Sequence, residues 1–131
     1  MIDVKGKRVY IFGPMTLAGP AGDWNFPAFR RAALLIEASG GIAVSPAKMD
    51  EAIWGFNGKG DIPPAMQLRN VIGIDLRVVA TCDIGYGLTN WSKSSGSLAE
   101  LALMQCLKMP VEFEVGAERG VVGAVLVTKE G

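Results

Sequence analysis

Short apolar runs that end at glycine or proline alternate along this chain with longer amphipathic stretches, and no other feature limits its fold as much. The runs lie at residues 9–12, 42–44 and 84–88, and the amphipathic stretches lie at residues 26–39, 65–80 and 95–108. A short, continuously apolar run is typical of a parallel strand buried on both faces, whereas a single apolar stripe is typical of a helix that covers a sheet. Strands that alternate with helices predict a parallel sheet with helices on both faces.

The C-terminal part of the chain modifies this plan. Residues 111–115 follow a Met-Pro break and predict a fourth strand, and residues 120–128 predict a fifth, antiparallel to the fourth because few residues join the two. Residues 50–64 combine two aromatic residues with three glycines and Pro63-Pro64, which favours a lid or rim. We therefore expect one α/β domain over residues 1–131, with a mostly parallel flavodoxin- or Rossmann-like sheet and an antiparallel C-terminal edge strand.

The charged residues exclude several classes of partner. Thirteen basic and 13 acidic residues cancel without long runs of either sign, unlike the basic surface typical of nucleic-acid or membrane-surface binders. The sequence contains neither a signal-peptide core nor an apolar stretch of membrane-spanning length. We expect a cytoplasmic protein that binds a small molecule and neither nucleic acid nor membrane.

The chain contains no histidine, so acid–base or nucleophilic chemistry falls to Asp, Glu, Tyr, Lys or Cys. Cys82 and Cys106 lie far apart among apolar neighbours and form no Cys-x-x-Cys pair, which favours two buried free thiols. With two thiols and no imidazole a tetrahedral zinc site is not expected. We predict neither a metal nor a cofactor.

Residues 94–100, Ser-Ser-Gly-Ser-Leu-Ala-Glu, form a small polar turn that opens a helix. Free N–H groups at a helix start bind anions such as phosphate, and Gly96 allows a close approach. Glu100, expected in the first helical turn, would then lie beside the sugar that carries the phosphate. The alternative is that Glu100 only complements the helix dipole. The loops after the three strands meet at the carboxyl edge of the sheet, so one crevice can hold base, sugar and phosphate.

Several short motifs, taken together, resemble a known family. They are residues 10–16, 25–29 (Asn-Phe-Pro-Ala-Phe) and 45–47 (Ser-Pro-Ala), then Asp75-Leu76, Cys82-Asp83 and Trp91-Ser92, and the turn that leads to Glu100. Over approximately residues 8–113 the chain resembles the nucleoside 2-deoxyribosyltransferase superfamily. It is most similar to short, phage-type domains, and its length is similar to that of the 2′-deoxynucleoside 5′-monophosphate N-glycosidase branch.

The resemblance implies roles for individual residues. Glu100 matches the glutamate that attacks C1′ of the deoxyribose, Asp75 the aspartate that protonates the departing base, and Tyr10 the tyrosine that contacts the sugar or the nucleophile. Ser94 and Gly96 match residues that hold the 5′-phosphate. The other substrate-binding positions are Gly13, Pro14, Met15, Asn25, Ser97 and Trp91. Small relatives of this kind also imply a homodimer.

The predicted activity is hydrolysis, or transfer, of the N-glycosidic bond of a 2′-deoxynucleoside 5′-monophosphate or nucleoside through a covalent deoxyribosyl–Glu100 intermediate. Such a reaction uses one ionised and one protonated carboxyl group. We expect the helix N-terminus and Tyr10 to keep Glu100 charged, and that charge, with partial burial, to keep a proton on Asp75.

Other interpretations stay open on sequence alone. Asp75 can instead pair with Arg69 or Arg77 on a solvated helix face, and Asp83, at the start of a strand, is expected to be structural. The protein can be a nucleotide-binding or sensing module without turnover, which would explain the glycines around Tyr86. It can also be a nucleosidase that acts on NAD or an ADP-ribose derivative.

Overall fold

The structure is a computed structural model that describes residues 2–15, 24–120 and 127–129. Four strands form one parallel sheet in the order β2-β1-β3-β4. They are β1 (Arg8–Phe12), β2 (Ile42–Val44), β3 (Ile84–Gly87) and β4 (Val111–Phe113). The helices are α1 (Phe26–Ala38), α2 (Pro46–Trp54), α3 (Leu68–Val79) and α4 (Ser95–Cys106), with a 3₁₀ turn η1 (Trp91–Lys93) before α4. The predicted α/β class with a parallel sheet is confirmed.

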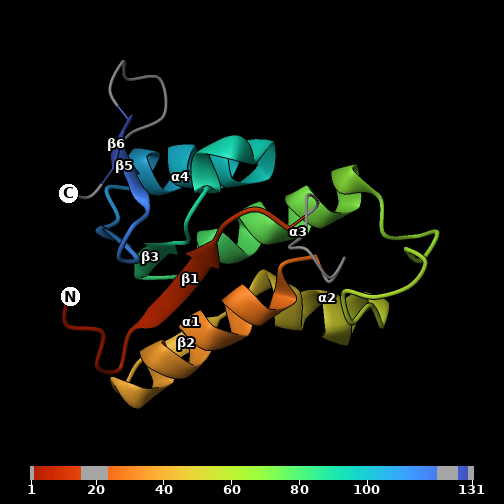
Figure 1. The fold of residues 1–131 in the computed structure, drawn as a ribbon, viewed down its shortest axis with the longest axis horizontal. Helices are drawn as coiled ribbons and strands as arrows, with labels where there is room; N and C mark the ends of the chain where they lie inside the picture. Colours follow the sequence, from red (N-terminus) through yellow and green to blue (C-terminus); the bar gives the residue numbers. More distant parts are fainter. Residues whose placement is uncertain (1, 16–23, 121–126, 130–131) are drawn as a thin grey trace.

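Strand β1 is buried on both faces of the sheet. Val9 and Ile11 pack into one core with α1, whereas Tyr10 and Phe12 pack into a second core with α4. Successive side chains of a strand point to opposite faces, so the apolar run at residues 9–12 serves both cores. Figure 1 shows α1 on one side of β1 and α3 and α4 on the other. Helices therefore cover both faces, as expected.

Gly85 in β3 lets α4 approach the sheet closely. A Cβ atom on Gly85 would overlap Met104 Sδ, and Gly85 is aligned with Tyr10 in the register of β1 and β3. Met104 and Glu100 are four residues apart in α4 and therefore share one helix face. The close approach over Gly85 thus brings Glu100 toward Tyr10.

Gly87 makes room for an aromatic cluster on the same face of the sheet. A Cβ atom on Gly87 would lie 2.8 Å from the Phe12 ring and 2.7 Å from the Phe113 ring. These two rings pack edge to face at 6.1 Å, and Trp91 joins them with centroids 6.0 and 5.6 Å away. The glycines around Tyr86 therefore have a packing cause and do not favour the sensing alternative.

Residues 50–64 do not form a lid or rim throughout. Helix α2 begins at Pro46, directly after β2, and ends at Trp54, and the chain is irregular only from Gly55 to the start of α3. Proline in the first helical turn and Gly55 in the left-handed region, with φ of 69°, mark the two ends of α2. Both signals are present in the sequence, but the prediction for this segment relied on its aromatic residues and glycines and therefore missed the helix.

The C-terminal strands also differ from the expectation, although residues 121–126 of the predicted fifth strand lie outside the described residues. β5 (Glu118–Gly120) and β6 (Val127–Lys129) pair antiparallel with each other in a separate ribbon, and no pairing of either with β4 is found in the described residues. The hydrogen bonds of Glu118 explain why β5 lies beside η1. Its carbonyl accepts a hydrogen bond from Trp91 Nε1 at 2.7 Å, and its carboxylate accepts from the Asn90 N–H at 3.0 Å and from the Ser92 hydroxyl. These bonds hold β5 against η1.

Two smaller expectations have different outcomes. Cys82 and Cys106 are free, but Cys82 is half-buried and Cys106, at the end of α4, is exposed, so the prediction of two buried thiols is wrong. Asp83 accepts a hydrogen bond from the Arg8 N–H at 2.9 Å and so ties the start of β1 to the start of β3, a structural role.

Among the described helices, none is both long and apolar enough to cross a membrane.

Candidate active site

Tyr10 and Glu100 meet between the sheet and α4. Both side chains are buried, with 0% and 5% exposure, and the Tyr10 hydroxyl donates a hydrogen bond to Glu100 Oε2. Because α4 begins at Ser95, Glu100 is its sixth residue and lies in the second turn, not the first. The effect of the helix dipole is confined to the first turn. The interpretation that Glu100 lies in the first turn and only complements the helix dipole is therefore wrong.

Asp75 reaches the same site from α3. Its side chain is 6% exposed. Within the described parts of the chain, its carboxylate forms no ion pair with Arg69 or Arg77. The solvated-face interpretation of Asp75 is therefore wrong.

One cavity of about 370 Å³ brings these groups together. Asp75 and Glu100 lie in its wall with two residues of the loop after β1, four residues of the turn that opens α4 and several apolar residues of α3: Gly13, Met15, Ser94, Ser95, Gly96, Ser97, Leu68, Val71 and Ile72. The carboxyl end of β1, the face of α3 and the start of α4 thus supply one site, at the sheet edge where ligands of parallel α/β proteins bind.

The turn that opens α4 presents polar groups to this cavity. Ser94 caps the helix, because its Oγ accepts a hydrogen bond from the Ser97 N–H at 3.2 Å. Ser97 Oγ is buried and, within the part of the chain that the structure describes, has no hydrogen-bond partner. Leaving a buried hydroxyl unpaired costs about 1–3 kcal/mol. A Cβ atom on Gly96 would lie 3.6 Å from Ile72, an ordinary contact, so packing does not demand a glycine there.

Burial controls the protonation of both carboxyl groups. It raises the pKa of Asp75 to about 7, with a smaller contribution from the charge of Asp50. It raises the pKa of Glu100 to about 8, because desolvation outweighs the opposing hydrogen bond from Tyr10. The expectation that Glu100 is held in its charged form is corrected accordingly. Since both pKa values lie near neutrality, the pair retains a proton there and can supply an acid and a carboxylate together.

Three predicted substrate-binding residues lie outside this cavity. Pro14 and Asn25 line a neighbouring polar cavity of about 310 Å³, where Asn25 Nδ2 donates to the Pro14 carbonyl at 2.9 Å. Trp91 is fully buried and donates to the Glu118 carbonyl. Its indole packs within the core, and stacking of Trp91 on a base does not fit this placement.

Sequence reasoning missed Asp50. This residue lies in α2, is 2% exposed, and its charge raises the pKa of both Asp75 and Glu100. The signal that could have found it is the helical spacing of Ala47 and Asp50 after Pro46, which places a carboxylate on the inner face of a short helix. No group of three or more cysteines and carboxylates among the described residues, those of this site included, could hold a metal ion.

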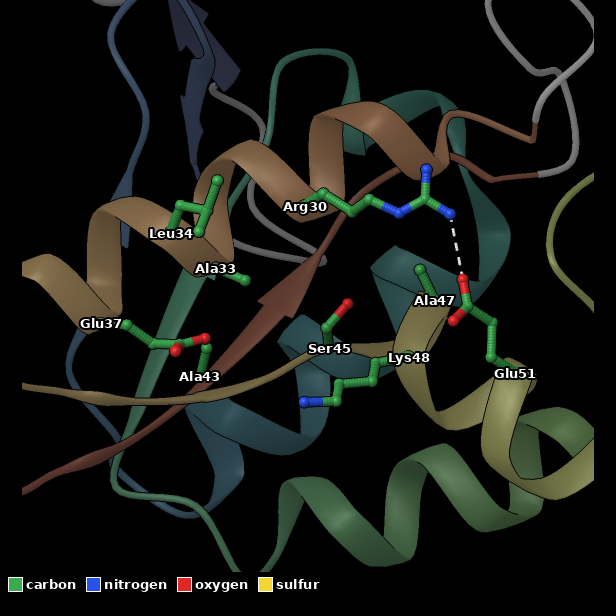
Figure 2. Close-up of a pocket in the computed structure, with 9 residues that line it drawn as sticks. All are labelled: Arg30, Ala33, Leu34, Glu37, Ala43, Ser45, Ala47, Lys48 and Glu51. Carbon is green, nitrogen blue, oxygen red and sulfur yellow. Dashed lines mark hydrogen bonds and ion pairs between the residues drawn. The ribbon is translucent and has the colours of Figure 1, made fainter.

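A further cavity of about 300 Å³ opens between α1, β2 and α2 (Figure 2). Figure 2 shows Arg30 of α1 reaching Glu51 of α2, and the two form an ion pair at 3.0 Å. Both side chains are about half exposed, and such pairs contribute little to stability. The described lining of this cavity includes none of the predicted site residues.

Comparison with known proteins places the chain in a family. Residues 7–113 match the model described as "Domain of unknown function (DUF4406)". The chain belongs to the DUF4406 family. This DUF4406 chain has a structure similar to that of a 2-desoxiribosyltransferase from Leishmania mexicana, with a TM-score of 0.59 and 18% identity, over 95% of this chain and 79% of that chain. The predicted resemblance to the nucleoside 2-deoxyribosyltransferase superfamily is thereby confirmed at the level of the fold. A search of curated proteins finds no match to this chain.

Proposed function

We propose that this protein breaks the N-glycosidic bond of a 2′-deoxynucleoside 5′-monophosphate or nucleoside, and that it transfers the sugar to water in preference to a second base. The observation that carries the proposal is the buried hydrogen bond from Tyr10 to Glu100, whose side chain lines the same cavity as Asp75. The fold shared with a protein named a 2-desoxiribosyltransferase supports the same class of chemistry.

In the first step the Glu100 carboxylate attacks C1′ of the deoxyribose. A bond forms between a Glu100 oxygen and C1′, the bond between C1′ and the base nitrogen breaks, and the electron pair leaves with the base. The reactive state is the one in which the proton retained by the pair lies on Asp75 and Glu100 is ionised, and from it Asp75 gives that proton to the departing base. The Tyr10 hydroxyl orients Glu100 and favours its charged form.

In the second step Asp75 acts as a base. It takes a proton from water, the water oxygen bonds to C1′, and the bond to Glu100 breaks, which restores the carboxylate. The N–H groups at the start of α4 and the unpaired Ser97 hydroxyl bind the 5′-phosphate. The products are the free base and the free sugar or its phosphate.

The test is release of free base, followed by chromatography, from a panel of 2′-deoxynucleoside monophosphates, 2′-deoxynucleosides and NAD. Glu100→Gln keeps the size of the side chain and removes the nucleophile, so turnover should fall by several orders of magnitude. Glu37→Gln, on the exposed face of α1, is the matched control and should retain activity.

Each possible result favours one function. Free base from a deoxynucleotide, lost only in Glu100→Gln, supports the proposal. Release from NAD alone would favour the nucleosidase that accepts a ribose. Binding of a nucleotide without any release would reject the enzyme and favour the sensing module.

A further inference from the structure

Asp50 is a buried carboxyl group that the two steps above do not use. Its side chain is 2% exposed, and Asp50 Oδ2 has no hydrogen-bond partner among the residues that the structure describes. Burial raises its pKa to about 7, so the carboxylate predominates at pH 8. A buried carboxyl oxygen without a partner is costly, and a ligand with an N–H donor would remove that cost.

Asp50 lies in the wall of an apolar cavity of about 210 Å³. The rest of the described lining is aromatic or aliphatic: Met15, Trp24, Ile62, Met66, Leu68 and Val71. An apolar cavity with one polar group is suited to a flat heterocycle that carries one directed hydrogen bond. Asp50 is the only charged residue in this described lining.

The apolar cavity adjoins the cavity that holds the two proposed catalytic carboxyl groups. Met15, Leu68 and Val71 line both. The charge of Asp50 also raises the pKa of Asp75 and of Glu100, which requires that the three groups lie near one another. A ligand whose phosphate lies at the turn that opens α4 can therefore extend past Asp75 into the apolar cavity.

We propose that the apolar cavity receives the base of the substrate and that Asp50 is a specificity-determining residue that selects a base with an exocyclic amino group. This inference rests on the proposed function. A carboxylate only accepts hydrogen bonds, so an amino group pairs with Asp50 Oδ2. An oxo group at the same position places two acceptors against each other and leaves both unpaired.

The experiment uses pairs of substrates in which an oxo group replaces the exocyclic amino group and the adjacent ring nitrogen accordingly carries a hydrogen. These are 2′-deoxyadenosine against 2′-deoxyinosine 5′-monophosphate, and 2′-deoxycytidine against 2′-deoxyuridine 5′-monophosphate, assayed for base release at pH 8. We expect kcat/KM to favour the amino member of at least one pair by about tenfold or more, the effect of one hydrogen bond to a charged group. Asp50→Asn, which offers an N–H to an oxo group, should remove most of that preference while base release from the oxo member persists.

The control variant is Asp61→Asn, which changes an exposed carboxylate of the irregular segment before α3 and should keep the preference. If Asp50→Asn does not fold, competition of free adenine against free hypoxanthine on the unmodified protein gives the same comparison, and adenine should inhibit about tenfold more strongly. Base release without preference for the amino member, or with a preference that Asp50→Asn leaves unchanged, would overturn this inference. The proposed function would not be affected by that result. An absence of base release from every substrate would reject the proposed function instead.

Discussion

The hydrogen bond from Tyr10 to Glu100 is the central contact at the scale of single residues. Burial and the nearby Glu100 raise the pKa of Tyr10 well above its ordinary value, so the phenol stays protonated and remains a donor. Its donation in turn opposes the effect of burial on the pKa of Glu100. Tyr10 is therefore expected to act on the reaction through the ionisation and orientation of the nucleophile.

Tyr10→Phe tests this relation. Without the donor the pKa of Glu100 should rise further, so the acidic limb of the pH–rate profile should move to higher pH. Loss of a hydrogen bond to a charged group, about 1.5–3 kcal/mol, should lower kcat by roughly 10- to 100-fold. Tyr86→Phe, on the opposite face of the sheet, is the control and should leave both the limb and kcat unchanged. If the acidic limb of the pH–rate profile of Tyr10→Phe does not move, Tyr10 does not control the ionisation of Glu100.

At the scale of elements, helix α4 carries both Glu100, the proposed nucleophile, and the turn proposed to bind the phosphate. Gly96 and Gly73 both lie within helices, and a Cβ atom on either would meet no close neighbour. Replacing a helical glycine by alanine stabilises a helix by about 0.5–1 kcal/mol. Gly96→Ala and Gly73→Ala should therefore both raise the melting temperature.

The two alanine variants should differ in substrate binding. Gly96→Ala places a methyl group in the turn proposed to hold the phosphate, so KM for a nucleotide should rise, whereas Gly73→Ala should leave KM unchanged. Steady-state kinetics and thermal unfolding of the same preparations give both quantities. Equal KM values in the two variants would remove Gly96 from the binding site.

The packing of β3 is a second property of the elements. Gly87→Ala would force a Cβ atom against the rings of Phe12 and Phe113, at 2.8 and 2.7 Å. Overpacking of a close-packed core costs about 1–3 kcal/mol. Chemical denaturation should show that loss for Gly87→Ala and none for Gly73→Ala. An unchanged free energy of unfolding would mean that the rings of Phe12 and Phe113 can shift to admit the Cβ atom without a loss of stability.

At the scale of the whole molecule, three buried carboxyl groups link stability to pH. The pKa values of Asp50, Asp75 and Glu100 are raised in the folded protein, to about 7, 7 and 8, from 3.8, 3.8 and 4.5. Between the unfolded and folded values the folded state binds more protons than the unfolded state. The contribution of these groups to stability is therefore greatest below pH 4 and is lost as the pH rises to about 8.

Glu100→Gln should remove the contribution of Glu100 to the pH dependence of the free energy of unfolding. The variant should be more stable than the unmodified protein at pH 8, by on the order of a few kcal/mol, and nearly equal to it at pH 4. The free energy of unfolding in urea, measured across this range, is the relevant quantity. Parallel curves for the two proteins would show that Glu100 does not titrate with a raised pKa.

Much of the architecture could be predicted from the sequence because it depends on local patterns. The apolar run at residues 9–12 indicated a strand buried on both faces, and Gly40-Gly41 indicated where α1 ends. Helix α2 was missed because its turn signals lie beside an aromatic, glycine-rich segment. The antiparallel edge strand was misplaced because the hydrogen bonds that position β5 join Glu118 to Asn90 and Trp91, more than 20 positions away in the sequence.

The sequence by itself determined the parallel α/β plan, and the missing histidine left any acid–base chemistry to Asp, Glu, Tyr, Lys or Cys. Only the tertiary structure decided which carboxyl groups are buried close to one another. Asp50, Asp75 and Glu100 come from three different helices, and burial sets their pKa values. Whether a carboxyl group is desolvated depends on every element packed around it, and no local pattern along the chain carries that information.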